Sequence, residues 1–163
     1  MIIELSIVIP IYNESESINS LAVKIENSLR NIAWQCIWVN DGSTDNSLFV
    51  LSSLKQRNSQ HVVIDLHKNY GQSAALMVGF KSSQGKYIGT LDGDGQNDPN
   101  DLAKMVLLLN DNAYDVINGY REKRQDSVIR KICSKIANSA RIFMTKEYEV
   151  RDVGCSTRVF RRE

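Results

Sequence analysis

Two aspartates, Asp92 and Asp94, are of the type and spacing that bind a metal ion. Residues 85–91 before them are β-rich and bounded by glycine, which predicts a strand that ends at the pair. Side chains two residues apart on an extended backbone point to the same side, so the two carboxylates can converge on one hard cation. The Gln96 carbonyl is a third candidate oxygen ligand. Mg²⁺ and Mn²⁺ prefer such ligands and commonly complete their shells with substrate phosphate.

An isolated Asp-x-Asp pair also matches a solvated acidic turn, so the elements around it decide between the two interpretations. Strand patterns alternate with helical patterns along the chain, which predicts an α/β fold with a parallel type of sheet. The predicted strands are 5–9, 36–39, 61–66, 87–91, 115–119 and 157–160. The predicted helices are 18–29, 48–54, 74–80, 102–109 and 126–145.

Short polar residues next to these segments are predicted helix caps. We expect Asn13 or Ser15 to cap the first helix and Thr44 to cap the second. Asp98, followed by Pro99, is expected to cap the helix after the acidic pair.

Each of the first four predicted strands runs into a polar loop. In a doubly wound sheet, ligands bind outside the carboxyl ends of the strands, so these loops are expected to line one crevice. Neither a Gly-x-Gly-x-x-Gly after the first strand nor a phosphate loop is present, which argues against a dinucleotide fold and a P-loop NTPase. The four loops contain Tyr12-Asn13-Glu14, Asp41-Gly42-Ser43, Asn69-Tyr70-Gly71 and Asp92-Gly93-Asp94.

Length and composition indicate one ordinary globular domain of 163 residues, with no apolar run long enough to cross a bilayer. The first residues lack the basic region and cleavage site of a signal peptide. Three widely spaced cysteines suggest reduced thiols rather than disulfides or zinc. We expect His61 and His67 to be structural and Trp34 and Trp38 to pack in the core.

The net charge of +1 conceals an asymmetry along the chain. Residues 1–117 carry 8 Lys and Arg against 13 Asp and Glu, whereas residues 118–163 carry 12 against 6. The basic end is expected to meet phosphate groups, an acidic membrane surface or nucleic acid, unless it is simply a solvated helix. Arg130 and Ser134, one turn apart on the predicted helix 126–145, would form a phosphate clamp.

Three motifs together resemble the family 2 glycosyltransferases. They are Val8-Ile9-Pro10-Ile11-Tyr12-Asn13-Glu14, Val39-Asn40-Asp41-Gly42-Ser43-Thr44-Asp45 and Leu91-Asp92-Gly93-Asp94-Gly95-Gln96. Gly119-Tyr120-Arg121, the helix with Arg130 and Ser134, and Asp152-Val153-Gly154-Cys155 resemble the dolichyl- and undecaprenyl-phosphate sugar transferases within that family. The resemblance implies a Rossmann-like GT-A fold, with a mostly parallel central sheet and helices on both faces.

The resemblance also implies roles for single residues. Asp92, Asp94 and Gln96 would hold Mg²⁺ or Mn²⁺ on the donor diphosphate. The donor-binding residues would be Pro10, Tyr12, Glu14, Asp41 and Asp92, with Asp41 meeting the base or the ribose. The acceptor phosphate would be held by Arg121, Arg130 and Ser134.

Asp152 and Asp94 are the predicted catalytic residues. Asp152 lies where related enzymes place a carboxylate that is often proposed as the base. A phosphomonoester, with a second pKa of about 6, is already ionised at neutral pH and hardly needs a base. We therefore hypothesise that Asp152 orients the sugar or an arginine instead.

The activity that the resemblance implies is an inverting transfer of a sugar from a UDP- or GDP-sugar to undecaprenyl or dolichyl phosphate, at the cytoplasmic face of the membrane. Family members run well past residue 163, so we expect a single, C-terminally truncated GT-A domain over 1–163. Residues 1–117 would bind the nucleotide sugar and residues 118–163 would form the basic acceptor side. Membrane contact through the missing part and a homo-oligomer are further expectations.

Three other functions compete with this one. The first alternative is a GT-A enzyme that glycosylates a saccharide hydroxyl in cell-envelope polysaccharide synthesis. Processive synthases of this fold would be expected to carry a Gln-x-x-Arg-Trp motif later in the chain, and this chain has no tryptophan after residue 38. A sugar nucleotidyltransferase would carry a basic glycine-rich loop after the first strand, where this chain has an acidic one. Nucleic-acid binding is not expected, because the basic end lacks interleaved aromatics and the first half is acidic.

Overall fold

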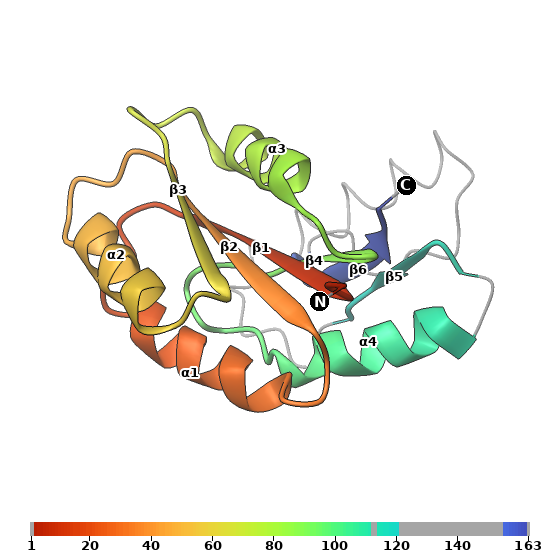
Figure 1. The fold of residues 1–163 in the computed structure, drawn as a ribbon. Coiled ribbons are helices and arrows are strands. Elements are labelled where there is room, and N and C mark those ends of the chain that lie inside the picture. Colours follow the sequence, from red (N-terminus) through yellow and green to blue (C-terminus); the bar gives the residue numbers. More distant parts are fainter. Residues whose placement is uncertain (1, 112–113, 121–154, 163) are drawn as a thin grey trace, which may run out of the picture. The chain divides into compact units, whose positions relative to one another are not determined.

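The computed structural model describes residues 2–111, 114–120 and 155–162 of the chain. Contacts divide the chain into one compact unit, Met1–Ile117 with Ser156–Glu163, and a second unit, Asn118–Cys155. The predicted helix 126–145 lies outside the described residues. Along the chain (Figure 1) the elements are β1 (Leu5–Ile11), α1 (Ile18–Ser28), β2 (Trp34–Asn40), α2 (Ser47–Arg57), β3 (His61–Asp65), α3 (Gln72–Ser82), β4 (Tyr87–Thr90), α4 (Asn100–Asp111), β5 (Val116–Asn118) and β6 (Arg158–Arg161).

The strands form one six-stranded sheet in the order β3-β2-β1-β4-β6-β5. β1 pairs in parallel with β2 and with β4, and β2 pairs in parallel with β3. β6 runs antiparallel to β4, with Thr90 opposite Arg158. The prediction of an α/β fold with a mostly parallel central sheet is therefore confirmed, and the carboxyl ends of β1 to β4 lie along one edge.

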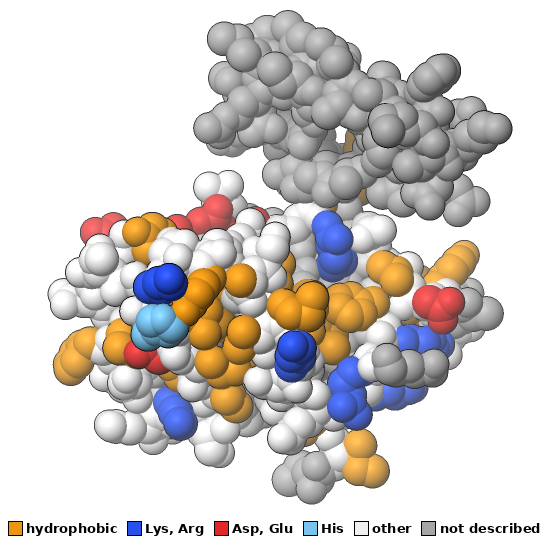
Figure 2. All heavy atoms as spheres, turned by 90° about the horizontal axis from the view of Figure 1, so that it is seen from above, with side chains coloured by type: hydrophobic (Ala, Val, Ile, Leu, Met, Phe, Trp, Pro, Cys, Tyr) orange, Lys and Arg blue, Asp and Glu red, His pale blue; other side chains and the backbone are white. Residues whose placement is uncertain are grey.

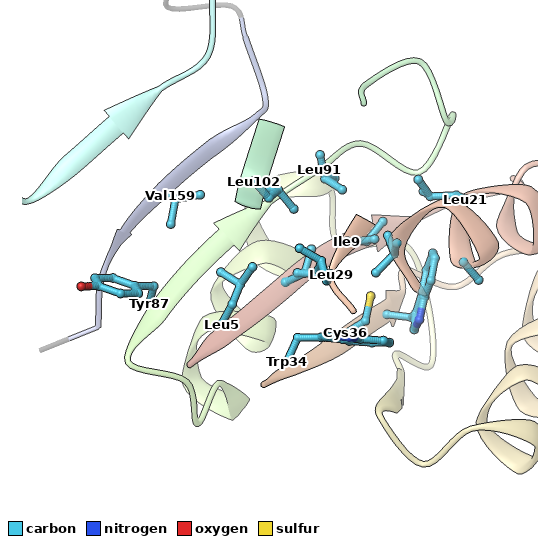
Figure 3. Close-up of a cluster of buried hydrophobic side chains, with 14 of the residues drawn as sticks. Leu5, Ile9, Leu21, Leu29, Trp34, Cys36, Tyr87, Leu91, Leu102 and Val159 are labelled. Carbon is cyan, nitrogen blue, oxygen red and sulfur yellow. The ribbon is translucent and has the colours of Figure 1, made fainter. Parts of the chain in front are cut away.

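Alternate residues of β1 point to opposite faces of the sheet, and each face has its own apolar core. Ile7 and Ile9 belong to the larger cluster, which also takes side chains from α1, α2 and α4 (Figure 3). Val8 packs on the other face with Ala75 of α3. Figure 1 accordingly shows α3 on one side of the sheet and α1, α2 and α4 on the other. All seven residues of β2 are buried, as expected for a parallel strand covered on both faces.

Side chains of both kinds, apolar and basic, lie at the surface on the side of the sheet that carries α3 (Figure 2). Met77 of α3, for example, is 54% exposed. In the described part of the chain, no helix combines the length and the apolar character needed to span a membrane.

Two of the predicted helix caps are wrong. The N-cap of α1 is Ser17, and the N-cap of α2 is Asn46. Asn13 does not cap α1, because its side chain accepts backbone N–H groups from the next loop instead. The third cap is confirmed, since Oδ1 of Asp98 accepts the backbone N–H of Asn100 at the start of α4.

His61 is buried in the core, as a structural histidine should be, and its tautomer is fixed by its neighbours. The indole N–H of Trp38 donates to Nδ1 of His61 over 3.0 Å, so this nitrogen carries no proton. Nε2 therefore carries the proton and donates to Oε1 of Glu26 at 3.0 Å. Burial lowers the pKa of His61 below its usual value of 6.5, although Glu26 acts in the opposite direction.

This histidine predicts a loss of stability on mild acidification. Because the pKa of His61 is lower in the folded protein, the unfolded chain takes up more proton at His61 as the pH falls below 6.5, so the free energy of unfolding falls by at most about 1.4 kcal/mol per pH unit. In His61→Gln this dependence should be lost, because glutamine does not titrate. Urea unfolding at pH 7.5, 6.5 and 5.5 measures it. The exposed His67→Gln should keep the wild-type dependence, and an unchanged slope in His61→Gln would contradict the assignment.

Candidate active site

Four loops meet at the edge of the sheet where β1 to β4 end. We call residues 12–17, 41–46, 66–71 and 91–99 the four-loop rim. Because the four strands are parallel, their carboxyl ends bring these loops to the same edge, although the loops are far apart in sequence. Side-chain hydrogen bonds then join each loop to its neighbours.

The β1 and β2 loops are joined through Asn13 and Asp45. Oδ1 of Asn13 accepts the backbone N–H of Thr44 at 2.8 Å, and the N–H of Asn13 donates to Oγ of Ser43 at 3.0 Å. Oδ2 of Asp45 accepts the backbone N–H of Ser15 at 3.1 Å. Burial opposes ionisation of Asp45, but its hydrogen bonds outweigh that effect and lower its pKa to about 2. The carboxylate is therefore charged, and the link intact, throughout the neutral range.

The β2 and β3 loops are joined through Asp41, whose side chain is buried. Its Oδ1 accepts the backbone N–H of Tyr70 at 2.8 Å, and its Oδ2 accepts that of Gly71 at 2.9 Å. Gly42 follows with a φ of +65°, and a Cβ there would lie 2.3 Å from the carbonyl carbon of Lys68. Asp41, predicted to bind the donor, thus also holds the β3 loop in place.

The β4 loop is held from two sides. Nε2 of Gln72, the first residue of α3, donates to Oδ1 of Asp92 over 3.2 Å. On the other side, the hydroxyl of Ser17 donates to the carbonyl oxygen of Gly93 over 2.5 Å. A Cβ at Gly93 would lie 2.5 Å from Cδ1 of Ile11, so this loop packs directly on the end of β1. These contacts close the rim and place Asp92 beside the β1 and β3 loops.

Asp94 lies two residues further along the same loop and is exposed. Its Oδ1 accepts the backbone N–H of Gln96 at 3.0 Å, which fixes the turn. Gly95 within this turn has a φ of +72°, and Nζ of Lys24 donates to its carbonyl oxygen at 3.3 Å. The loop that carries the three predicted metal ligands, Asp92, Asp94 and Gln96, is therefore shaped by the protein itself.

The other predicted donor residues belong to β1 and the loop after it. Pro10 is partly buried within β1, and Tyr12 is 47% exposed at the mouth of the rim. The backbone N–H of Glu14 donates to Oγ of Ser47 at 3.0 Å, and its Oε2 lies 3.3 Å from Oγ of Ser17. The structure thus brings Tyr12, Glu14 and Asp41 into the loops that surround Asp92.

Residues of the β1 and β2 loops line a hollow of about 460 Å³. Three of its lining side chains are acidic and, within the described residues, none is basic, so its charge does not suit a diphosphate. We therefore place the candidate site at the acidic pair and not in this hollow. The residues that line it are Asn13, Glu14, Ser15, Glu16, Thr44 and Asp45.

Comparison with known families identifies this arrangement. The family model described as "Glycosyl transferase family 2" matches residues 6–163. The chain belongs to this family. Among curated relatives of this family 2 chain is the undecaprenyl-phosphate 4-deoxy-4-formamido-L-arabinose transferase of Salmonella typhimurium, which is 38% identical over 162 residues. That match covers 98% of this chain and 49% of the relative, so the chain spans about half the length of the curated relatives it matches.

Solved structures of glycosyltransferases have the same fold as this family 2 chain. Glucosyl-3-phosphoglycerate synthase from Mycobacterium tuberculosis, in complex with Mg²⁺ and UDP, matches with a TM-score of 0.78 and 16% identity, over 98% of this chain and 56% of that one. A mannosyltransferase from Pyrobaculum calidifontis, in complex with GDP-Man and Mn²⁺, matches with a TM-score of 0.72 and 16% identity, over 97% and 44%. These likenesses establish the GT-A fold.

The acidic pair of this family 2 chain suits a divalent cation that is shared with a phosphate ligand. Oδ1 of Asp92 and Oδ1 of Asp94 each accept a hydrogen bond, while Oδ2 of each has no protein partner in the described part of the chain. Over residues 2–111, 114–120 and 155–162, no three His, Cys, Asp or Glu gather closely enough to hold a metal by themselves. Mg²⁺ bound by two carboxylates ordinarily takes its other ligands from substrate phosphates and water.

Two residues that hold the β4 loop, Gln72 and Ser17, are not predicted from the sequence. Gln72 was not singled out, although an amide at the start of the helix after a polar loop is a usable signal. Ser17 was missed because nothing local shows that its hydroxyl reaches the β4 loop. The acceptor and catalytic residues that lie outside the described residues are Arg121, Arg130, Ser134 and Asp152.

Proposed function

We propose that the protein is an inverting glycosyltransferase that moves a sugar from a UDP- or GDP-sugar to a polyprenyl phosphate at the inner face of the membrane. Its family and the printed name of the 38% identical relative support this proposal. The single observation in the structure that carries it is the closed four-loop rim, which holds Asp92 next to the loops of Tyr12 and Asp41.

The donor half of the proposal follows from charge. Breaking the bond between a sugar and a diphosphate leaves negative charge on the departing phosphate. A divalent cation on Asp92 and Asp94, with Gln96 as a further ligand, would stabilise that charge and orient the donor. The side chains of Tyr12 and Glu14 and the backbone around Asp41 and Pro10 would then form the walls for the nucleoside.

The acceptor half rests on the basic end of the chain. Arg121, Arg130 and Ser134 would hold the acceptor phosphate, because arginine forms paired hydrogen bonds with phosphate oxygens and offsets the repulsion between two anionic substrates. Asp152 would orient the sugar or one of these arginines, since an ionised phosphate is already a nucleophile. Contact with the membrane is part of the same proposal, because a polyprenyl phosphate acceptor lies in the bilayer.

A thermal-shift panel tests the donor half. UDP or GDP at about 100 times its dissociation constant should add about 2.7 kcal/mol, or roughly 5–10 °C in Tm, only when Mn²⁺ is present. EDTA is the control, and ADP and CDP serve as comparison ligands. No metal-dependent shift with any diphosphate would contradict the proposal.

A product assay tests the acceptor half. Full-length protein, the selected nucleotide sugar and Mn²⁺ should yield a polyprenyl-phosphate sugar of inverted anomeric configuration, as read by mass spectrometry and NMR. Exclusive transfer to a saccharide hydroxyl would replace the proposal by the polysaccharide-synthesis alternative.

Arg130→Ala should raise KM for the lipid phosphate while leaving donor binding unchanged.

A further inference from the structure

Gln72 makes the one side-chain contact by which the described protein holds Asp92. Its Nε2 donates to Oδ1 of Asp92 over 3.2 Å, across twenty positions of sequence. Gln72 opens α3, directly after the β3 loop, and Asp92 lies in the loop after β4, so the contact joins the start of α3 to the β4 loop.

The loop holds the backbone around Asp92, since the carbonyl oxygen of Gly93 accepts the hydroxyl of Ser17, but it does not hold the carboxylate. Within the described residues, the bond from Gln72 is the one hydrogen bond to the carboxylate oxygens of Asp92. A free carboxylate next to glycine can rotate about its side-chain bonds, and a cation must then order it on binding. A donor on Oδ1 removes that freedom and leaves Oδ2 without a protein partner among the described residues.

The backbone that carries Gln72 is itself fixed. The N–H of Gly71 donates to Oδ2 of the buried Asp41 at 2.9 Å, and the carbonyl of Gly71 accepts the N–H of Ala74 at 3.0 Å. Gly71 also adopts a φ of +91°, which sets the direction in which the chain enters α3. Contacts therefore run without a gap from Asp41 through Gly71 and Gln72 to Asp92.

We propose that Gln72 is a positioning residue that orients Asp92 toward the divalent cation bound with the donor diphosphate. The inference rests on the proposed function, because it assumes that Asp92 is a metal ligand. Removing a hydrogen-bond donor that orients a metal-binding side chain typically weakens metal binding by about 10–100-fold. Gln72 itself is exposed, so its loss should leave the fold without the metal unaffected.

Gln72→Met tests the inference, because methionine keeps the length of the side chain and loses the N–H donor. Gln56→Met is the matched control: Gln56 is exposed on α2 and has no side-chain hydrogen bond in the described part of the chain. Mn²⁺ is titrated by electron paramagnetic resonance with saturating UDP or GDP, whichever nucleotide stabilises the wild type. We expect Mn²⁺ to bind Gln72→Met about 10–100-fold more weakly and Gln56→Met as tightly as wild type.

Two further readouts separate positioning from a general structural role. The melting temperature of each variant without metal should lie within about 1 °C of wild type. Turnover by full-length Gln72→Met should fall at limiting Mn²⁺ and recover at saturating Mn²⁺. If the melting temperature of metal-free Gln72→Met fell far enough for unfolding alone to account for the weaker Mn²⁺ binding, the inference would be overturned.

The outcomes also separate this inference from the proposed function. If wild-type protein binds Mn²⁺ with the nucleotide and Gln72→Met binds it equally well, the inference fails and the proposed function stands. If wild-type protein binds no Mn²⁺ with any diphosphate, both fail.

Discussion

Replacing Asp92 or Asp94 by alanine should lower kcat of the full-length enzyme by about 10³-fold, or about 4 kcal/mol in activation free energy. Each change removes one of the two carboxylates that would hold the cation against the departing diphosphate, and the cation supplies most of the charge stabilisation in that step. Sugar transfer with saturating donor and Mn²⁺ measures the effect. We expect kcat to fall by a larger factor than the affinity for the nucleotide measured without metal.

The control for this prediction is Asp101→Ala. Asp101 is an exposed carboxylate in the first turn of α4, and its partner is Lys104 on the surface at 3.0 Å. Removing it deletes the same charge from the helix that follows the acidic loop and should leave kcat within about twofold of wild type. If Asp92→Ala or Asp94→Ala kept a tenth of the wild-type kcat, the acidic pair would not be the metal site.

Gly42→Ala should destabilise the protein by about 3 kcal/mol or more, since it combines two separate penalties. A φ of +65° is unfavourable for alanine, and its Cβ would lie 2.3 Å from the carbonyl carbon of Lys68 and 2.5 Å from the amide nitrogen of Asn69. Both neighbours are backbone atoms, so the β2 and β3 loops would have to separate. Urea unfolding gives the free energy, and loss of the contact should also weaken nucleotide binding.

Gly95→Ala separates the two penalties. Gly95 has a similar φ of +72°, but a Cβ there would have no atom within 4 Å. It should therefore show the backbone penalty alone, about 1–2 kcal/mol. Equal losses in the two variants would mean that the β2 and β3 loops can move apart freely, contrary to the close packing of the rim.

Much of the fold is predictable from local patterns, because buried parallel strands are apolar almost throughout. β1 and β2 are recognisable for this reason, and the polar loops follow at the expected edge. Two of the predicted helix caps failed for a different reason. Asn13 is a good capping residue by type, yet its side chain accepts the backbone N–H groups of Thr44 and Asp45 in the β2 loop. The hydroxyl of Thr44, the other expected cap, lies 3.3 Å from the same oxygen of Asn13. Propensity cannot show which backbone N–H a short polar side chain will find once distant loops meet.

The candidate site, like the fold, is predictable from the sequence only in part. The spacing of Asp92 and Asp94 places them on one loop, and that much follows from the sequence. The contacts from Gln72 and Ser17 depend on how α1 and α3 approach the β4 loop, and on which side of the sheet each helix packs. Asp41 shows the limit most clearly, because its type and position suggest a ligand contact while its two oxygens also hold the neighbouring backbone.

The placement of β6 has a consequence for biosynthesis. Among the described strands, β6 comes last in sequence and lies between β4 and β5, although more than sixty residues separate it from β4 along the chain. A ribosome must therefore deliver residue 161 before the hydrogen-bonding groups on that side of β4 can be paired. A nascent chain that stalls earlier would present an open strand edge, which is a template for aggregation. Chaperone capture during translation is therefore expected to persist until this strand emerges.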